Sequence, residues 1–305
     1  MKKFSLIFIK FFFVRIVFFA FYYTINFIPL RLHEPIANAL GWLGFHLSGK
    51  HRGVMMDNLK IAFEKEYTEE ERAKIALRSY QNMAMSGLEF FRLPRLSNED
   101  VLRIMTIEGE EHLRNAAEAG KGSVVVSAHF GNWEILAARL VAMGYKLTVV
   151  GRDQNDILIN DIIKRLRGGR GTVIIPRGAP VYEQFLNCLR NNELIGLVAD
   201  QNAGYKGIFV DFFGRPASTF KGPGLFAVKT GSPIIPLFAV RRGYNKHHTV
   251  ICPPVTIEPT GDENQDILLY AKGFTKVIED MIRRYPDHWL WVHKRWKTLP
   301  PEKQS

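Results

Sequence analysis

A histidine and a glutamate five positions apart are the residues of this chain best suited to chemistry. His129 follows the apolar run 123–128, and Glu134 comes shortly after Gly131-Asn132. Apolar residues at helical spacing then run from 133 to 143, so a helix should begin near Glu134. The pair therefore flanks a strand-to-helix turn at the carboxyl end of a strand, where open α/β sheets bind ligands.

A histidine at such a turn can act as a general base if a carboxylate fixes its tautomer and stabilises the imidazolium. Glu134 is the nearest candidate for that carboxylate. A histidine and an acid at this separation also arise by chance, and the segment would then be no more than a capped helix start. Ser127 lies two positions before His129, but no Gly-x-Ser-x-Gly elbow surrounds it, which argues against a hydrolase triad.

Further motifs follow in order along the chain. Asp200-Gln201-Asn202 ends a second apolar run. The others are the segment 207–219, which contains Phe212-Phe-Gly-Arg-Pro-Ala, the segment 233–237, and Pro286-Asp-His-Trp-Leu-Trp-Val-His-Lys-Arg-Trp at the end of the chain.

Together with His129-x4-Glu134, these motifs resemble the lauroyl and myristoyl acyltransferases that add secondary acyl chains to lipid A in Gram-negative bacteria. That family belongs to the glycerolipid acyltransferase superfamily, and the resemblance spans roughly residues 30 to 297. It implies transfer of a fatty acyl chain from a thioester, carried by acyl carrier protein or coenzyme A, to a hydroxyl of a lipid A precursor. It implies neither a cofactor nor a metal.

In such a reaction His129 would remove the proton of the attacking hydroxyl, and Glu134 would orient the imidazole and offset its developing charge. The oxyanion of the tetrahedral intermediate needs donors, and backbone amides beside Gly131 or a nearby arginine could supply them. We assign Gly131 and Asn132, on the same turn, to substrate binding.

Arg152 and Arg215 are the basic residues that we expect to bind substrate phosphate. Arg152 follows the apolar run 147–150, near the same sheet edge as His129, and Arg215 matches a phosphate-contacting motif of the wider superfamily. Asp200 lies at a strand end and could either reach the mouth of the site or cap a turn. Arginines 165, 167, 170 and 177 could also meet phosphate, although each taken singly fits a solvated surface better.

The composition fits an enzyme at a membrane. The 305 residues, 47% hydrophobic, can fill a sizeable core, and a net charge of +11 would attract phospholipid head groups, lipid A phosphates, an acidic carrier protein or nucleic acid. Charge alone does not choose among these partners. The two cysteines fit no disulfide framework and no metal-ligand spacing.

The composition of the amino terminus indicates that the partner is a membrane and not nucleic acid. Residues 1–30 are dominated by Phe, Ile, Val and Tyr, and we expect a retained anchor helix that either spans the membrane or lies in its interface. We expect residues 31–305 to form the acyltransferase domain. An enzyme that uses a cytoplasmic donor would sit at the inner membrane and face the cytoplasm.

Alternating strand-like and helical runs predict an α/β fold with a central mixed, largely parallel sheet covered by helices on both faces. Strands are expected at 123–128, 147–150, 172–175, 194–199, 208–212, 234–240 and 249–252. Helices are expected at 55–91, 133–143, 157–166, 180–190, 222–229 and 266–284. The tryptophans and His293 and Arg295 of the last motif alternate as an extended segment would, for packing and interfacial anchoring.

Three alternatives stay open. The acceptor could be another glycolipid, such as a mannoside, or a lysophospholipid, acylated from acyl-CoA. The protein could be a non-enzymatic basic protein that binds membrane or nucleic acid, in which case His129 would be dispensable. A metal-assisted lipid hydrolase with His129 and Glu134 as ligands would need a third ligand, which no motif spacing supplies.

Overall fold

The computed structural model describes the chain except for residues 1–11, 13–14, 17, 152–155, 177–179 and 301–305. Its centre is a seven-stranded sheet in the order β1-β9-β8-β2-β5-β3-β4. Five neighbouring strands from β8 to β4 run parallel, whereas β9 pairs antiparallel with β8 and parallel with β1. The strands are β1 Met105–Glu108, β2 Ser123–Ser127, β3 Leu147–Gly151, β4 Val173–Pro176, β5 Leu194–Val198, β8 Ile234–Gly243 and β9 Lys246–Ile251.

Helices cover both faces of this sheet. The side chains of β2 divide between two buried clusters: Val124 and Val126 pack with residues of α9, α10 and α11, and Val125 packs with residues of α5, α6 and α7. This alternation is expected for a central strand buried on both sides. The helices are α5 Asn98–Ile104, α6 Glu110–Glu118, α7 Trp133–Ala142, α8 Ile157–Gly168, α9 Val181–Arg190, α10 Gly222–Thr230 and α11 Glu263–Arg284.

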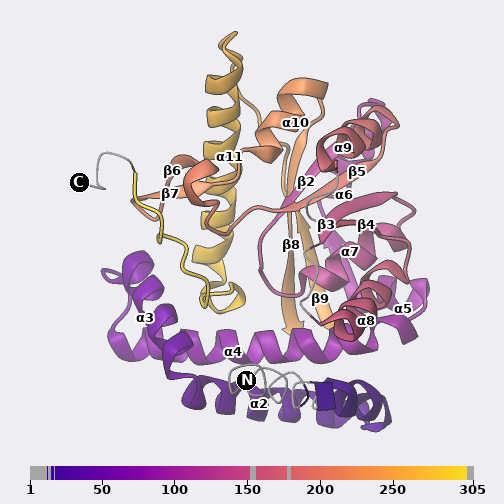
Figure 1. Cartoon of the computed structure of the whole chain (residues 1–305), viewed down its shortest axis with the longest axis vertical. Coiled ribbons are helices and arrows are strands. Elements are labelled where there is room, and N and C mark those ends of the chain that lie inside the picture. The colour runs from indigo at the N-terminus through magenta and orange to yellow at the C-terminus, as the bar shows by residue number, and fades with distance from the viewer. Residues whose placement is uncertain (1–11, 13–14, 17, 152–155, 177–179, 301–305) are drawn as a thin grey trace, which may run out of the picture.

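Three helices precede the sheet: α2 His33–Leu47, α3 Gly49–Phe63 and α4 Glu69–Arg92. Thr68 caps α4 in a capping box with Glu71. In Figure 1, α4 runs across the end of the sheet at which the arrowhead of β8 lies, and α2 lies on the far side of α4. The amino-terminal helices therefore cover the end of the sheet at which β8 finishes.

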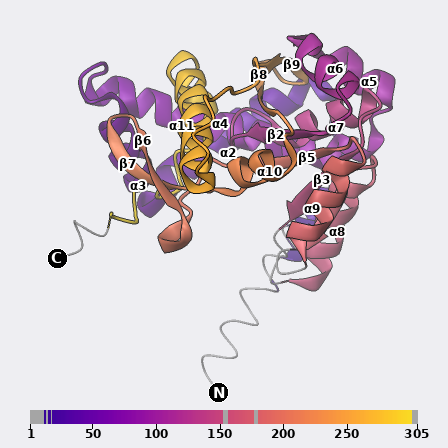
Figure 2. The same ribbon diagram turned by 90° about the horizontal axis from the view of Figure 1, so that it is seen from above.

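A separate hairpin of β6 Ile208–Phe212 and β7 Arg215–Thr219 lies beside α11, at the opposite end of the molecule from α8 and α9 (Figure 2). Short 3-10 turns occur at Ile25–Phe27, Leu30–Leu32, Leu93–Arg95, Gly204–Lys206 and Pro286–His288. The predicted fold class is confirmed. The sequence prediction missed β1 and β7, and it placed β6 in the main sheet.

The carboxyl-terminal segment 286–296 is held by side chains of α3 and α4. The buried Asn58 donates two hydrogen bonds, to the carbonyls of Trp291 and His293, both at 2.7 Å. Ser79 donates to the carbonyl of Trp289 at 2.6 Å. The segment was predicted to be extended and partly interfacial, but Trp289 and Trp291 are fully buried. Their large rings fill the space between the helices and the β6–β7 hairpin instead of facing a membrane.

The first part of the predicted anchor 1–30, residues 1–11, 13–14 and 17, lies outside the described part of the chain. Residues 18–24 are helical, and Phe18, Phe21 and Tyr22 pack against Phe91 of α4. Among the described residues, none of the helices combines the length and the apolar character that a membrane crossing requires. The described end of the predicted anchor thus folds onto the body of the protein.

Asn58 provides a test of how the carboxyl-terminal segment is fixed. Asn58→Ala should lower the free energy of unfolding by about 2–3 kcal/mol, because two buried carbonyls lose their donor. Urea unfolding followed by circular dichroism measures this, with Asn264→Ala in the exposed first turn of α11 as the control. Equal stability of the two variants would contradict the assigned role.

Candidate active site

His129 and Asp200 meet at the carboxyl ends of two neighbouring strands. β2 and β5 are parallel, and Ser127 lies opposite Val198, so the residues just beyond both strands share one edge. The Nδ1 atom of His129 lies 2.8 Å from Oδ1 of Asp200. The backbone amide of His129 also donates to Oδ2 of Asp200 at 3.0 Å. The carboxylate therefore holds both the ring and the main chain of the histidine.

Asp200 is buried, and a third donor fixes it. The indole Nε1 of Trp289 donates to Oδ2 at 2.7 Å. Burial alone would raise the pKa of Asp200, but the charge of His129 and these hydrogen bonds hold that pKa below its ordinary value. Asp200 is thus ionised beside the imidazole at neutral pH.

The bond to Asp200 also sets the state of the imidazole. A carboxylate only accepts, so Nδ1 carries the proton and Nε2 of the neutral ring has its lone pair free. The side chain of His129 is 24% exposed, and the amide nitrogen of Gln201 lies 3.5 Å from Nε2. Burial alone would lower the pKa of His129, but the charge of Asp200 and the hydrogen bond to it raise this pKa. His129 is therefore arranged as a base stronger than an ordinary histidine.

Glu134 does not take the position predicted for it. We expected its carboxylate to orient His129, but the structure gives that place to Asp200. Glu134 instead accepts hydrogen bonds from Nε of Arg167, at 3.0 Å to both oxygens, and from Nη2 at 2.5 Å. The physical reason is direction: Glu134 lies on the first turn of α7, where it pairs with Arg167 of α8, whereas Asp200 follows the end of β5, the strand adjacent to β2. The charge of Glu134 still helps to raise the pKa of His129, and that of Arg167 opposes it.

Gly131 and Asn132 are buried, and each has partners within the protein. Gly131 has a φ of +55°, and a Cβ atom there would collide with the carbonyl oxygen of Ala239, so only glycine fits. Asn132 caps α7 by accepting from the amides of Glu134 and Ile135, at 3.2 and 3.1 Å. Contact of either residue with substrate stays a prediction.

The backbone amides of the turn are largely engaged. The amide of Gly131 donates to the carbonyl of His288 at 2.9 Å, and that of Phe130 donates to Ala128 at 2.7 Å. With the amide of His129 on Asp200 and those of Glu134 and Ile135 on Asn132, five amides of this segment have acceptors within the protein. Of the arginines considered from the sequence, Arg167 pairs with Glu134 at the turn, and its charge acts to lower the pKa of His129.

Of the two arginines predicted to bind phosphate, Arg152 and Arg215, the structure describes the position of Arg215. Arg152 lies outside the described residues, as does Arg177. Arg215 is exposed at the start of β7 in the separate hairpin. Arg170 donates to the carbonyl of Leu96 and to Asn98, so it supports the α4–α5 connection. Within the described parts of the chain, no group of three or more His, Cys, Asp or Glu side chains could hold a metal ion.

Sequence reasoning placed His129 and Asp200 at strand ends but missed three functional contacts. These are the Asp200–His129 bond, the Arg167–Glu134 pair and the Trp289 indole behind Asp200. The order of the strands in the sheet would have indicated the first, because residues that follow adjacent parallel strands meet.

Comparison with known proteins shows the family of the chain. Residues 2–298 match the family described as bacterial lipid A biosynthesis acyltransferase. The chain is 26% identical over 259 residues to a lipid A biosynthesis palmitoleoyltransferase of Escherichia coli (84% of this chain and 82% of the relative), and 24% identical over 277 residues to the lauroyltransferase of the same organism (90% and 88%). It is 34% identical over 154 residues to a phosphatidylinositol mannoside acyltransferase of Mycobacterium tuberculosis, covering 48% of each chain.

The match runs through almost the whole chain and includes the turn on which His129 meets Asp200. The protein is therefore an acyltransferase, and it belongs to the bacterial lipid A biosynthesis acyltransferase family.

Proposed function

We propose that this enzyme transfers a fatty acyl chain from an acyl thioester to a hydroxyl of a lipid A precursor, with His129 as the general base. The observation that carries the proposal is the His129–Asp200 bond, which leaves Nε2 unprotonated at a partly exposed position. The family match and the two lipid A relatives that span more than four-fifths of the chain support the class of acceptor.

The proposed reaction begins when Nε2 of His129 accepts the proton of the acceptor hydroxyl. The hydroxyl oxygen then attacks the thioester carbonyl and forms a tetrahedral intermediate. Asp200 remains ionised and stabilises the imidazolium, as the carboxylate of a catalytic triad does. When the intermediate collapses, the carbon–sulfur bond breaks, and the imidazolium returns its proton to the departing thiolate. The products are the acylated acceptor and a free thiol.

We assign Arg167 to the oxyanion and Glu134 to holding Arg167. The side chain of Arg167 is 30% exposed, and two nitrogens of its guanidinium donate hydrogen bonds to Glu134. One donor aimed at an oxyanion typically contributes about 3 kcal/mol to the transition state. Glu134 would thus act through Arg167 and through its charge near the imidazolium, and not by a bond to His129.

For the donor we favour acyl carrier protein over acyl-CoA, because an acidic carrier suits a chain with a net charge of +11. A second acceptor class has a specific observation in its favour. The phosphatidylinositol mannoside relative shows higher identity than the lipid A relatives, although the match covers only 48% of this chain. A mannosylated phospholipid also presents a hydroxyl on a sugar attached to an anionic lipid.

The first test uses purified protein, lauroyl acyl carrier protein and a lipid A precursor, with mass spectrometry of the lipid product. His129→Ala should lower turnover roughly 100- to 10,000-fold, because the hydroxyl loses its proton acceptor. His248→Ala on β9, away from the site, serves as the control. Near-normal turnover in folded His129→Ala would contradict the mechanism, whereas product only with a phosphatidylinositol mannoside would move the acceptor to the second class.

The second test is the pH profile. Catalysis needs unprotonated Nε2, so kcat/KM should rise with pH through an apparent pKa above the ordinary histidine value of about 6.5. In Asp200→Asn the charge of Asp200, which raises the pKa of His129 more than that of Glu134 does, is lost while burial remains, so this apparent pKa should fall. Turnover should also drop roughly 100- to 10,000-fold, because the tautomer is no longer fixed. Asp280→Asn on the exposed face of α11 is the control, and an unshifted profile in Asp200→Asn would exclude the pairing.

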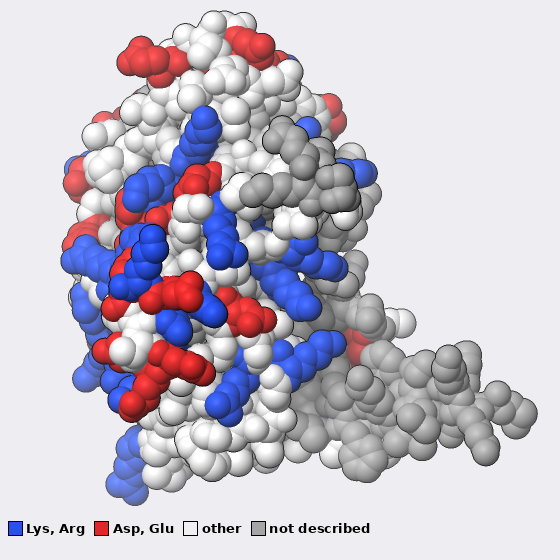
Figure 3. All heavy atoms as spheres, turned by 90° about the vertical axis from the view of Figure 1, so that its left-hand side faces the viewer, with Lys and Arg blue, Asp and Glu red and all other residues white. Residues whose placement is uncertain are grey.

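We also propose that the enzyme works at the inner membrane, facing the cytoplasm, and that the segment 27–47 contacts the lipid. Its exposed apolar residues include Phe27 (82% exposed), Leu47 (81%) and Trp42 (50%). The basic side chains of Arg31, Lys50 and Arg52 are exposed nearby in sequence and suit anionic head groups. By contrast, the face shown in Figure 3 mixes Lys and Arg with Asp and Glu, so its charge does not favour an anionic surface.

Replacing Trp42, Leu43 and Leu47 together by serine should weaken binding to vesicles that contain anionic phospholipid, because α2 loses its exposed apolar surface. Vesicle flotation measures this, and Leu102→Ser with Val173→Ser, also exposed apolar positions, is the matched control. Equal binding by the two variants would place the membrane contact elsewhere, in the amino-terminal residues or the basic side chains.

A further inference from the structure

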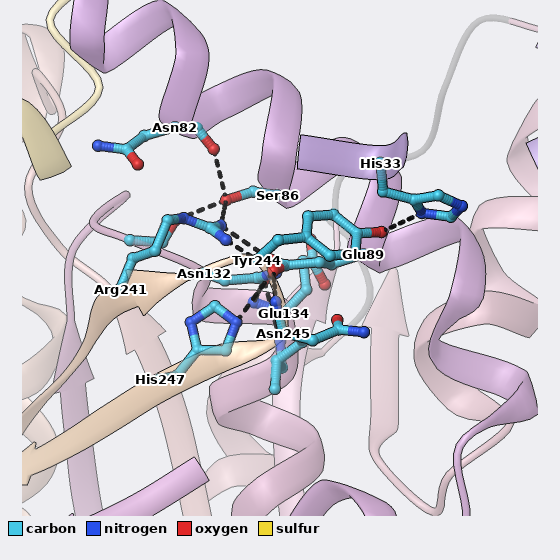
Figure 4. Close-up of polar contacts among 12 residues, drawn as sticks. His33, Asn82, Ser86, Glu89, Asn132, Glu134, Arg241, Tyr244, Asn245 and His247 are labelled. Atoms are coloured by element: carbon cyan, nitrogen blue, oxygen red, sulfur yellow. Dashed lines mark hydrogen bonds and ion pairs between the residues drawn. The ribbon is translucent and has the colours of Figure 1, made fainter. Parts of the chain in front are cut away.

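A second buried carboxylate, that of Glu89, contacts the catalytic turn through Asn132. Glu89 of α4 is fully buried and accepts from both terminal nitrogens of Arg241 on β8, at 2.6 and 2.8 Å (Figure 4). It also accepts from the amide of Asn245 at 2.8 Å, and Nε2 of His247 lies 3.2 Å away. Burial alone would raise the pKa of Glu89, but the charges of Arg241 and His247 hold that pKa well below its ordinary range.

Burying this charged cluster costs more free energy of desolvation than burying apolar side chains would. Desolvating two charges is expensive, and a buried ion pair is often no more stable than hydrophobic residues of the same volume. Neither Glu89 nor Arg241 contacts His129 or Asp200, so the cluster does not take part in proton transfer. Its remaining contacts indicate what it does.

Glu89 determines how the side-chain amide of Asn132 is turned. Nδ2 of Asn132 donates to Oε2 of Glu89 at 2.7 Å, and an amide that directs its nitrogen to a carboxylate must direct its oxygen the other way. That oxygen accepts from the amides of Glu134 and Ile135 and so begins α7. The carboxylate therefore fixes the start of the helix that carries Glu134, the partner of Arg167.

The cluster reaches the turn by a second route. Nη2 of Arg241 donates to the hydroxyl oxygen of Ser86 at 2.8 Å. The single proton of this hydroxyl is shared between two carbonyls, that of Gly131 at 3.0 Å and that of Asn82 at 2.9 Å. The amide of Arg241 also donates to Nε2 of His288 at 3.1 Å, and the carbonyl of His288 accepts from the amide of Gly131. Two successive residues of the turn are thus tied to one buried ion pair.

We propose that Glu89, together with Arg241 and Ser86, is a positioning residue for acyl transfer that sets the turn 129–134 and the start of α7. The proposal rests on the function proposed above, because the turn carries its general base and the partner of its oxyanion donor. Asp200 fixes the imidazole from one side, and Glu89 fixes the backbone that bears it from the other.

The first experiment compares Glu89→Gln with Glu279→Gln. Glu279 is a buried carboxylate on α11 with an arginine partner, Arg283 at 2.9 Å, and it does not contact the turn. Glu89→Gln should lower kcat roughly 100-fold with KM for lauroyl acyl carrier protein changed less than about threefold, because a small displacement of reacting groups has this effect. Glu279→Gln should lower the melting temperature without lowering kcat. Equal kcat in the two folded variants would overturn the proposal.

A rescue variant separates positioning from general damage to the core. Asn132→Asp keeps an oxygen for the helix cap but sets a carboxylate against Glu89, so it should lower kcat as much as Glu89→Gln. In the double variant Glu89→Gln with Asn132→Asp, the glutamine amide can donate to the new carboxylate, and kcat should recover at least tenfold over either single variant. If the fold losses in kcat of the two single variants simply multiply in the double variant, the proposed role of the hydrogen bond between residues 89 and 132 is contradicted. Ser86→Ala, which removes only one hydroxyl, gives the same comparison if Glu89→Gln does not fold.

Hydrogen–deuterium exchange provides a readout that does not depend on substrate. In Glu89→Gln the amides of residues 131–136 should exchange faster, while those of α11 should keep their protection. Unchanged protection of residues 131–136 would overturn the proposal even if activity fell. If the wild-type protein acylates neither a lipid A precursor nor a phosphatidylinositol mannoside, the proposed function fails, and the exchange data still decide whether Glu89 sets the turn.

Discussion

The arrangement of the site depends on one interaction, the bond between the buried carboxylate of Asp200 and His129. A charged carboxylate without solvent is tolerated only when donors surround it, and Asp200 has three: the ring and the amide of His129, and the indole of Trp289. The last donor makes the carboxyl terminus part of the site. Trp289 is held in turn by Ser79 of α4, so the base depends on residues from the amino-terminal helices, the sheet and the last segment of the chain.

Asp200 and Glu89, the two buried carboxylates near the turn, have different roles. Asp200 contacts the imidazole directly, and its charge changes the proton affinity of His129. Glu89 does not touch the imidazole, and its own charge is balanced by Arg241, so what it contributes is geometry transmitted through Asn132 and Ser86. Such a division is reasonable for a base whose pKa must stay near neutrality, because a second uncompensated charge close to His129 would raise its pKa further and leave it protonated.

The sequence predicted the α/β fold class and the position of His129 at a strand end, because both depend on local patterns. Apolar runs that end in polar residues marked the strand ends of His129 and Asp200. The partner of His129 could not be read in the same way, since β5 lies beside β2 only in space, with β3 and β4 between them in sequence. Glu134 was nearer along the chain, but the direction of the first turn of α7 takes it to Arg167. β1 is four residues long and too short for a periodic pattern, and Arg241 looked like any polar residue at a strand end.

α4 connects the catalytic turn to the surface that we assign to the membrane. Glu89 on this helix reaches the turn through Asn132, and the same helix packs against α2 in a cluster that includes Ala37, Leu88 and Tyr244. The hydroxyl of Tyr244 lies 2.6 Å from Nδ1 of His33 at the start of α2, and the neighbouring amide of Asn245 donates to Glu89. α2 and the catalytic turn are both fixed to α4. The packing on α4 therefore sets the distance between His129 and a lipid surface bound by α2. His129 would therefore lie at a constant distance from the bilayer that holds the acyl chains of the acceptor. The polar head that carries the hydroxyl would have to extend to Nε2 of His129.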